Sequence, residues 1–262
     1  MVKLVAKQPI DPNALPGLSL LLNPNNVAFD DRMPDGFTAT LDDTRLEVGG
    51  SGFGYWFSKP KAKGTVTDIK DYFADTLVYR LSGADVSLKD IAGTDVASAT
   101  ALFFQGDDQF KGSPGDDTFM GRGGDDILAG RLGNDTLLGL GGKDLLDGSE
   151  GSDTLDGGRG KDTYLFKTAP VTGEVDTIVK FGTGEIIKLT ASAFAGLTPG
   201  PLSADQFVFG TAAGDEDDRL LYDQASGALA YDADGSGSGT AIQFAQLQPG
   251  LTNFSADNIF VI

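Results

Sequence analysis

The sequence contains no cysteine and no histidine among its 262 residues. The missing cysteine excludes disulfides, thiolate nucleophiles and cysteine metal sites. The missing histidine excludes Ser-His-Asp triads, histidine-ligated zinc and HExxH proteases. No run reaches the roughly 18 apolar residues of a membrane span, and residues 1–9 lack the apolar core of a cleaved export signal. Any enzymatic chemistry must therefore rest on carboxylates or a metal, and any export must use another route.

Basic residues are also scarce, with 20 lysines and arginines against 38 acidic residues and a net charge of −18. This balance excludes nucleic acid and anionic membrane surfaces as partners. Apolar residues make up 40% of the chain, which is enough for a core, and 37 glycines suit many tight turns better than helices. The excess acids are either a solubility device or ligands for a cation that relieves their repulsion.

A nine-residue repeat occupies the middle of the chain. It reads GSPGDDTFM, GRGGDDILA, GRLGNDTLL, GLGGKDLLD, GSEGSDTLD and GGRGKDTYL over residues 112–165, after a degenerate copy, FFQGDDQFK, at 103–111. Each copy has a glycine at position four, an aspartate at position six and an apolar residue at position eight. The aspartates are Asp108, Asp117, Asp126, Asp135, Asp144, Asp153 and Asp162. A period of nine fits a short strand and a tight turn repeated as one unit, with the apolar residues stacked into a thin core.

The turns offer hard oxygen ligands. Glycines at positions one and four allow φ > 0, so that the turn can aim its carbonyl oxygens inward beside the aspartate. Calcium takes six to eight such oxygens and tolerates imperfect geometry, whereas magnesium demands a tighter octahedron. The alternative is a metal-free solenoid in which aspartates merely form turns. Repulsion between aspartates stacked about 4.8 Å apart disfavours that alternative.

The repeat resembles the GGxGxDxUx nonapeptide of RTX (repeats-in-toxin) calcium-binding proteins. The resemblance implies an all-β fold, a parallel β-roll (β-solenoid) of stacked nonapeptide turns flanked by N-terminal and C-terminal β-rich capping segments. It also implies about five calcium ions, shared by Asp108/Asp126, Asp117/Asp135, Asp126/Asp144, Asp135/Asp153 and Asp144/Asp162. Backbone carbonyls complete the predicted shells, from Gly112, Gly115, Gly121, Gly123, Gly124, Gly130, Gly133, Gly139, Gly142, Gly148, Gly151 and Gly160.

The chain departs from the RTX pattern at several places. Phe103 and Phe104 replace both leading glycines of the first copy, so the outermost site lacks them. A glycine at position two survives only at Gly158. Position five varies, as expected if it contributes a carbonyl alone. Asp176 begins a stretch resembling the D-x-I-x-D-F segment that follows RTX blocks, but Lys180 replaces the second aspartate, so no calcium ligand is expected there.

The flanking regions predict β structure. We expect an N-terminal β-rich capping domain (1–102), the β-roll (103–167) and a C-terminal β-rich cap (168–262). Within the first, residues 1–35 read as irregular, segments 37–41, 44–48, 53–57, 64–69 and 76–81 read as strands, and a short helix is expected within 85–104. The cap should contain strands at 176–181, 185–189, 219–223, 228–232, 241–247 and 258–262. Residues 232–237 resemble the start of an EF-hand loop, although a hairpin turn fits better, and the acidic run 214–218 reads as a solvated loop.

Two functions remain open. In the first, the chain is a non-catalytic, secreted calcium-binding protein, as the resemblance implies: type I secretion machinery reads an uncleaved C-terminal signal, and the block folds on calcium outside the cell. In the second, it is a carbohydrate-binding or carboxylate-based carbohydrate-active module with its site in residues 35–100, and an extracellular polysaccharide as partner. Trp56 with Tyr55, Phe53 and Phe57 could form a stacking platform for sugar, although a buried strand explains these aromatics more simply.

Overall fold

In the computed structural model, residues 104–262 are described in full, and eight strands are described before them by their backbone alone. These strands are β1 (Lys3–Ala6), β2 (Ala28–Met33), β3 (Gly36–Leu41), β4 (Thr44–Ser51), β5 (Tyr55–Trp56), β6 (Lys59–Pro60), β7 (Thr65–Phe73) and β8 (Thr76–Ser87). Over these described residues the chain is all-β, as predicted, with no α-helix. No described helix is long and apolar enough to span a membrane.

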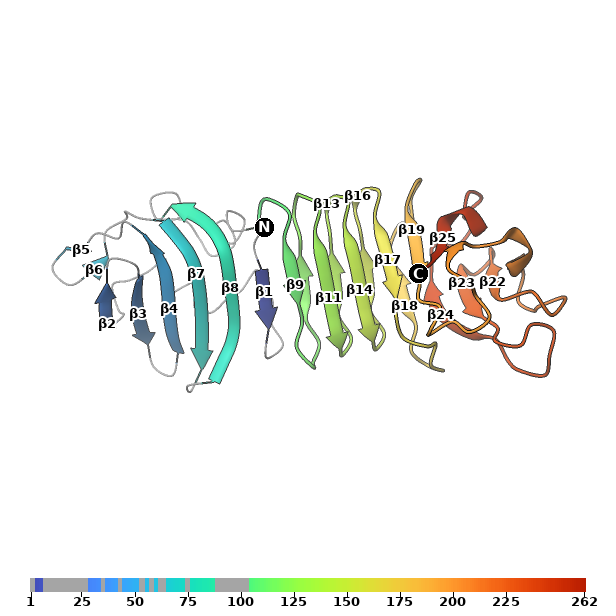
Figure 1. Cartoon of the computed structure of the whole chain (residues 1–262), viewed down its shortest axis with the longest axis horizontal. Coiled ribbons are helices and arrows are strands. Elements are labelled where there is room, and N and C mark those ends of the chain that lie inside the picture. Colours follow the sequence, from blue (N-terminus) through green and yellow to red (C-terminus); the bar gives the residue numbers. More distant parts are fainter. Residues whose placement is uncertain are drawn as a thin grey trace.

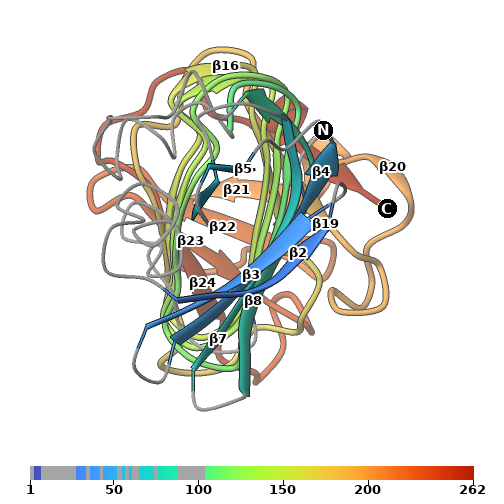
Figure 2. The ribbon, with the colours of Figure 1, turned by 90° about the vertical axis from the view of Figure 1, so that its left-hand side faces the viewer.

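The repeat block forms two large parallel sheets that face each other, and successive nonapeptides alternate between them (Figure 1). A third, two-stranded parallel sheet pairs β13 (Gly141–Gly142) with β16 (Arg159–Gly160). One sheet contains β9 (Gln109–Lys111), β11 (Ile127–Leu132), β14 (Leu145–Glu150) and β17 (Thr163–Phe166), and the other contains β10 (Thr118–Met120), β12 (Thr136–Leu138) and β15 (Thr154–Asp156). Leu128 pairs with Leu146, and Leu137 with Leu155, so neighbouring strands lie 18 residues apart. Two nonapeptides therefore make one coil, and Figure 2 shows the coils superposed along the long axis as a flattened ring.

The apolar residues at position eight fill the space between the two sheets. Their side chains are completely buried from Phe119 to Tyr164. They are Phe119, Leu128, Leu137, Leu146, Leu155 and Tyr164. A three-residue strand cannot bury such a side chain alone, so each coil depends on its neighbours for a core. At the first coil, Phe104 extends this core by packing against Phe110, with ring centroids 5.0 Å apart.

Both sheets continue beyond the block into the C-terminal region. The sheet that contains β17 continues through β19 (Ile186–Leu189), the last strand β25 (Ile259–Val261) and β20 (Gly200–Pro201). The sheet that contains β15 continues through β18 (Asp176–Ile178), β24 (Ile242–Gln246), β23 (Ala228–Tyr231), β22 (Leu220–Asp223) and β21 (Phe207–Phe209). Two short 3-10 helices, Ala204–Gln206 and Ala256–Asn258, complete it. The strands expected in this region are confirmed, except that the first ends at Ile178 instead of residue 181. The C-terminal strand is paired on both sides, by β19 and β20.

The N-terminal strands extend the first sheet at its other end. Strand β1 pairs antiparallel with β8 and parallel with β9, so it joins an antiparallel sheet to the roll (Figure 1). The predicted strands at 37–41, 44–48 and 64–69 correspond to β3, β4 and β7. The irregular reading of residues 1–35 is wrong at β1 and β2, because prolines near them do not interrupt the strands themselves. Strand β8 runs on to Ser87, and the rest of the segment expected to hold a helix, 88–103, lies outside the described residues.

Candidate metal centre in the aspartate turns

The aspartates at position six form a continuous ladder along each side of the roll. One carboxylate oxygen, Oδ1, accepts a hydrogen bond from the backbone N–H of the aspartate 18 residues earlier. The N···O distances are 2.7 Å for Asp108/Asp126, Asp117/Asp135 and Asp135/Asp153, 2.9 Å for Asp126/Asp144 and 3.0 Å for Asp144/Asp162. These are the five pairs that the RTX resemblance implies. The aspartate side chains are all at most 2% exposed.

The second carboxylate oxygen has a different environment. In Asp126, Asp135, Asp144, Asp153 and Asp162, the Oδ2 atom is buried without a hydrogen-bond partner in the described structure. A buried anionic oxygen without a donor is costly, so a compensating cation is the physical expectation. Asp117 differs, because its Oδ2 accepts from the backbone N–H of Ser113 at 2.7 Å.

The unpartnered oxygen faces the position-one glycine of its own turn and the following coil. A Cβ atom on Gly121 would lie 2.2 Å from Oδ2 of Asp126 and 3.0 Å from the carbonyl oxygen of Gly139. On Gly139 it would lie 2.2 Å from Oδ2 of Asp144 and 2.8 Å from the carbonyl oxygen of Gly157. An aspartate oxygen of one coil and a carbonyl oxygen of the next thus converge on one small space. Oxygens gathered without a donor form the kind of environment that calcium takes.

The glycines serve the turn in two ways. Position-four glycines from Gly124 onward have positive φ, such as 141° at Gly142, and a Cβ there would lie 1.8 Å from the carbonyl oxygen of Gly124. The prediction of φ > 0 is therefore confirmed at position four. It is wrong at position one, where none of the glycines from Gly112 to Gly157 has positive φ. There the carboxylate occupies the space that a Cβ would need.

From Arg122 onward, position two is left-handed although most of its residues carry a side chain. Positive φ angles of 73–94° occur at four non-glycine residues, Arg122, Arg131, Leu140 and Ser149, and Gly158 has φ of 89°. An L-residue in this region is strained by roughly 1–2 kcal/mol. The turn geometry of the repeat is thus retained where the RTX glycine is absent.

Burial raises the pKa of five ladder carboxyl groups, those of Asp126, Asp135, Asp144, Asp153 and Asp162. The pKa of Asp126 rises to about 7, chiefly because burial disfavours the charged form, with further repulsion from Asp144 and Asp108 and partial relief from the backbone hydrogen bond. The same causes raise the pKa of Asp135 to about 7 and that of Asp144 to about 6. Without a cation, the ladder therefore carries charges that its environment opposes at neutral pH.

A second ladder runs along position five, which the sequence pattern missed. The side-chain oxygens of Asp107, Asp116, Asp125 and Asn134 each accept from the backbone N–H of the residue 18 positions later, at 2.7–2.8 Å. Position five was expected to contribute a carbonyl alone, and this expectation is wrong for these four residues. The recurrence of Asp and Asn in the first copies was the available signal.

The acidic ladder also continues past the repeat block. After Asp162 the spacing is 14 residues to Asp176 and then nine to Glu185, and both side chains are buried, at 6% and 3% exposure. Each acid is followed two residues later by a buried isoleucine, Ile178 or Ile187. These residues complete two further degenerate turns. The apolar residue two positions on was the signal that could have identified them.

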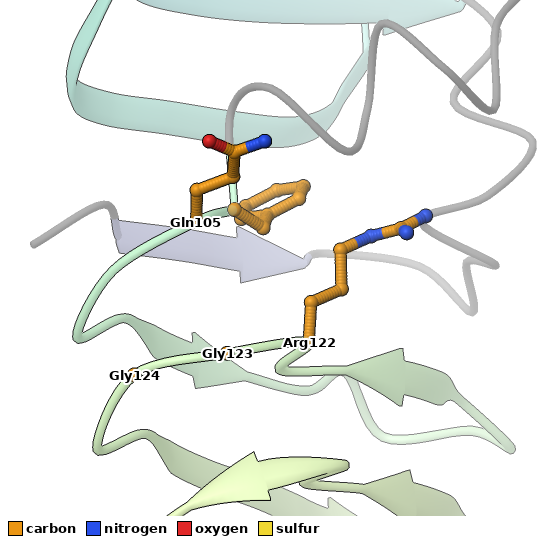
Figure 3. A pocket seen from close by; sticks show the side chains of 5 residues that line it. Gln105, Arg122, Gly123 and Gly124 are labelled. Atoms are coloured by element: carbon orange, nitrogen blue, oxygen red, sulfur yellow. The ribbon is translucent and has the colours of Figure 1, made fainter.

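At the other end, the first coil has a different construction. A hollow of about 400 Å³ is lined by Phe104, Gln105, Arg122, Gly123 and Gly124. Figure 3 shows the long side chain of Arg122 rising from the segment that carries Gly123 and Gly124, toward the side on which Gln105 lies. Phe104, one of the two residues that replace leading glycines, is 1% exposed and serves the core instead. The hydrogen bond between Asp108 and Asp126 still forms below it.

Comparisons with known proteins identify the block. The RTX calcium-binding nonapeptide repeat (4 copies) matches residues 104–137 and 130–164. Residues 104–164 are an RTX calcium-binding repeat block. Among solved structures, the AlgE6R3 subunit from the Azotobacter vinelandii mannuronan C5-epimerase matches with 25% identity over 60% of this chain and 78% of that one, with a TM-score of 0.24. No curated protein matches.

Within the described part of the chain, no three or more acidic side chains converge so that they could hold one metal ion, either in the RTX block or outside it. Each aspartate pair would therefore need backbone carbonyls to complete a calcium shell. Carbonyl oxygens of Gly130, Gly139 and Gly157 lie next to the position-one glycines of the preceding coil, where such ligands are needed. Gly157 was not among the predicted ligands, and the calcium-binding role of all the predicted carbonyl oxygens stays a prediction.

The lesser sequence signals have clear structural places. Residues 232–237 lie in the connection between β23 and β24, which pair antiparallel as a hairpin requires. The acidic run is exposed at 214–217, as a solvated loop should be. Asp218 differs, because its buried carboxylate accepts from the backbone N–H of Gly214 at 2.6 Å and of Asp215 at 3.1 Å. The aromatic side chains at 53–57 lie outside the described residues.

Proposed function

We propose that the chain is a secreted, non-catalytic RTX protein whose roll folds when about five calcium ions bind between its coils. The ions would lie at the five aspartate pairs, with carbonyl oxygens of the turns as further ligands. The observation that carries the proposal is the set of buried Oδ2 atoms without a donor, beside which, at Asp126 and Asp144, a carbonyl oxygen of the next coil approaches.

The charges of the ladder explain why folding would depend on calcium. Two carboxylates about 5 Å apart repel by roughly 3 kcal/mol at an effective dielectric constant near 20. This repulsion recurs along both sides of the roll and opposes the burial of its thin core. Calcium reverses the sign of the interaction, so its binding free energy becomes folding free energy.

Such dependence suits export to the outside of the cell. A chain that is loose in the calcium-poor cytosol can pass a type I secretion channel, and it would fold where calcium is abundant. Extracellular calcium modules work with dissociation constants on the order of 10⁻⁴–10⁻³ M. The composition supports this location, because a chain without cysteine needs no disulfide chemistry after export.

Circular dichroism of the full chain tests the proposal. In EDTA we expect a largely unordered repeat block, and on calcium addition a gain of β signal over a narrow concentration range. Magnesium at the same concentration is the matched control and should produce much less, since it demands a smaller and more regular shell. A spectrum that is the same in EDTA and in calcium would contradict calcium-dependent folding.

A further inference from the structure

One edge of the roll carries a row of exposed basic side chains. Lys143, Arg159, Lys161 and Lys180 lie in three successive turns, on the edge that also carries β13 and β16 (Figure 1). All four are exposed, and within residues 104–262 no ion pair is described for any of them. We call this row the basic strip. Exposed cations without carboxylate partners are available to an anionic ligand, although the chain as a whole carries a net charge of −18.

The pairing of the turns aligns the strip with the long axis of the roll. Strand β13 pairs in parallel with β16. Lys143 and Lys161, 18 residues apart, therefore hold equivalent positions on neighbouring coils, whose strands are spaced by about 4.8 Å. The side-chain carbons of Lys161 lie 3.3–3.5 Å from where a Cβ of Gly184 would stand, so this side chain lies over the next turn. The commonest other residues of these turns are glycines, which have no side chain to keep a ligand away: Gly139, Gly141, Gly142, Gly157, Gly158, Gly160, Gly182 and Gly184.

The charge of this edge depends on the proposed calcium ions. Its turns, at 105–108, 121–126, 139–144, 157–162 and 179–185, contain seven acidic and five basic residues, a net charge of −2. Three of the five aspartate pairs lie on this edge, and one ion at each would change the net charge to +4. The edge is therefore expected to become cationic only when calcium is bound.

The opposite edge of the roll stays acidic under the same conditions. Its turns, at 112–117, 130–135, 148–153 and 166–176, contain seven acidic and two basic residues, a net charge of −5. The two aspartate pairs on that edge would leave it at −1 with one ion each. The two edges thus differ in sign once the sites are filled, and an anionic ligand would be directed to the strip.

The shape of the strip selects among anionic ligands. A row one turn wide, with a cation on successive coils, matches a single extended polymer chain that carries acidic groups at intervals. Duplex DNA is a poor match, because it is wide and carries one charge per roughly 1.7 Å, so that its phosphates would also meet the acidic parts of the surface. A polysaccharide with sparse carboxylates is thin enough to lie on the edge alone.

We propose that the basic strip binds a linear acidic polysaccharide once calcium has filled the turns beneath it. This inference rests on the proposed function, because the strip is cationic only if the aspartate pairs hold calcium. It places a polysaccharide site on the roll itself, outside residues 35–100. Calcium would then control both the folding of the roll and the attachment of the folded protein to its partner.

The test is binding of the full-length chain to carboxymethyl dextran, measured by biolayer interferometry in saturating calcium and in EDTA. Unmodified dextran of the same length is the matched control ligand, since it has the same backbone without the carboxylates. We expect binding to carboxymethyl dextran in calcium, no binding to dextran, and loss of binding in EDTA. Binding to both polymers alike, or binding that is unchanged in EDTA, would overturn the inference.

Two double variants locate the site. Lys143→Gln with Lys161→Gln removes two of the four strip cations, and at the strength of exposed ion pairs this should weaken binding by roughly 5–30-fold. Lys111→Gln with Lys188→Gln is the matched control, because it changes the net charge equally on the outer face of β9 and β19, and its binding should equal that of the wild type. If calcium ions merely bridge carboxylates of the protein and the polymer, the strip variant will bind as tightly as the wild type, which refutes the role of the strip.

The remaining outcomes separate this inference from the proposed function. Circular dichroism of each chain in calcium shows whether the roll folds; a wild type that does not fold on calcium contradicts the proposed function itself. A wild type that folds but does not bind carboxymethyl dextran overturns the strip alone, and so does an equal loss in the control variant. Tighter binding to a single-stranded oligonucleotide than to carboxymethyl dextran would show that the assigned class of partner is wrong. If the strip variant does not fold, Arg159→Gln alone decides, with an expected loss of roughly 2–5-fold and refutation if binding is unchanged.

Discussion

Replacing Asp126 by asparagine should change stability in opposite directions with and without calcium. Without calcium, Asp126→Asn removes a buried charge that neighbouring carboxylates repel. Its new amide N–H₂ would lie where Oδ2 now faces the carbonyl oxygen of Gly139 unpartnered, and could donate to it. Relief of one repulsion of about 3 kcal/mol and a hydrogen bond of about 1 kcal/mol, reduced by solvent screening, predict a gain of about 1–3 kcal/mol for the calcium-free fold.

With calcium, the same substitution should destabilise the fold. Asp126 belongs to two proposed pairs, with Asp108 and with Asp144, so one change weakens two sites. A tenfold loss of affinity at each is about 1.4 kcal/mol per site, and saturated sites pass such losses to the folded state. The expected loss is therefore about 2–3 kcal/mol.

The assay is unfolding followed by circular dichroism in two buffers. In saturating calcium, the urea midpoint of Asp126→Asn should fall below that of the wild type. In EDTA, the concentration of trimethylamine oxide needed to induce β structure should fall as well, because this osmolyte favours the compact state. Asp205→Asn, an exposed aspartate in the first 3-10 helix, controls for net charge. A variant that is less stable in both buffers would refute the role of Asp126 as a cation ligand.

Three further predictions concern the turns. Burial raises the pKa of Asp126 to about 7 from an unfolded value near 4, so the calcium-free fold binds more protons than the unfolded chain between these pH values. The stability of the calcium-free fold should therefore be greatest below about pH 4 and decline as the pH rises to 7, which would be seen as a loss of β signal in EDTA. A β signal that increases with pH would contradict this prediction. Leu140→Gly should raise the melting temperature by about 1–4 °C, because Leu140 has a strained φ of 75° and is 42% exposed. Leu132→Gly is the control and should lower the melting temperature, because Leu132 is similarly exposed, at 40%, but lies within strand β11. A lower melting temperature for both variants would refute strain at position two. Gly142→Ala should abolish calcium-induced folding, since its Cβ would lie 1.8 Å from a backbone oxygen, while Gly106→Ala, with open space around it, should fold normally in the same titration.

The regular spacing explains how much of the roll could be predicted. Because the period of nine never slips between Asp108 and Asp162, the pairing of each aspartate with the one 18 residues later follows once two repeats make one coil. The buried position-eight residues follow from the same period, because a strand must send alternate side chains to one face. These parts depend on repetition, together with the two repeats per coil that the RTX resemblance implies.

Other parts of the site depend on contacts that repetition does not encode. Five additional residues in one loop place Asp176 out of the period, although its backbone contact with Asp153 is unchanged. Tyr164 reads as a core residue from its position, but its hydroxyl reaches Glu185. The left-handed turn at Arg122 could not be inferred either, since an arginine gives no sign of positive φ and the surrounding turns impose it.

The two oxygens of each ladder aspartate have different partners, and this division bears on cooperativity. Oδ1 of Asp144 accepts from the N–H of Asp126 in the preceding coil, while its Oδ2 approaches the carbonyl oxygen of Gly157 in the following one. At the proposed sites, an ion bound on one side of a coil would therefore orient the carboxylate needed for the next site. The stability of stacked repeats is close to a sum of the intrinsic stabilities of the repeats and the interaction energies between neighbours. Such coupling between neighbouring coils favours calcium binding that proceeds from one coil to the next. The two rows of aspartates share no carboxylate, and the core between the sheets, where Leu137 and Leu146 are both completely buried, is what joins them.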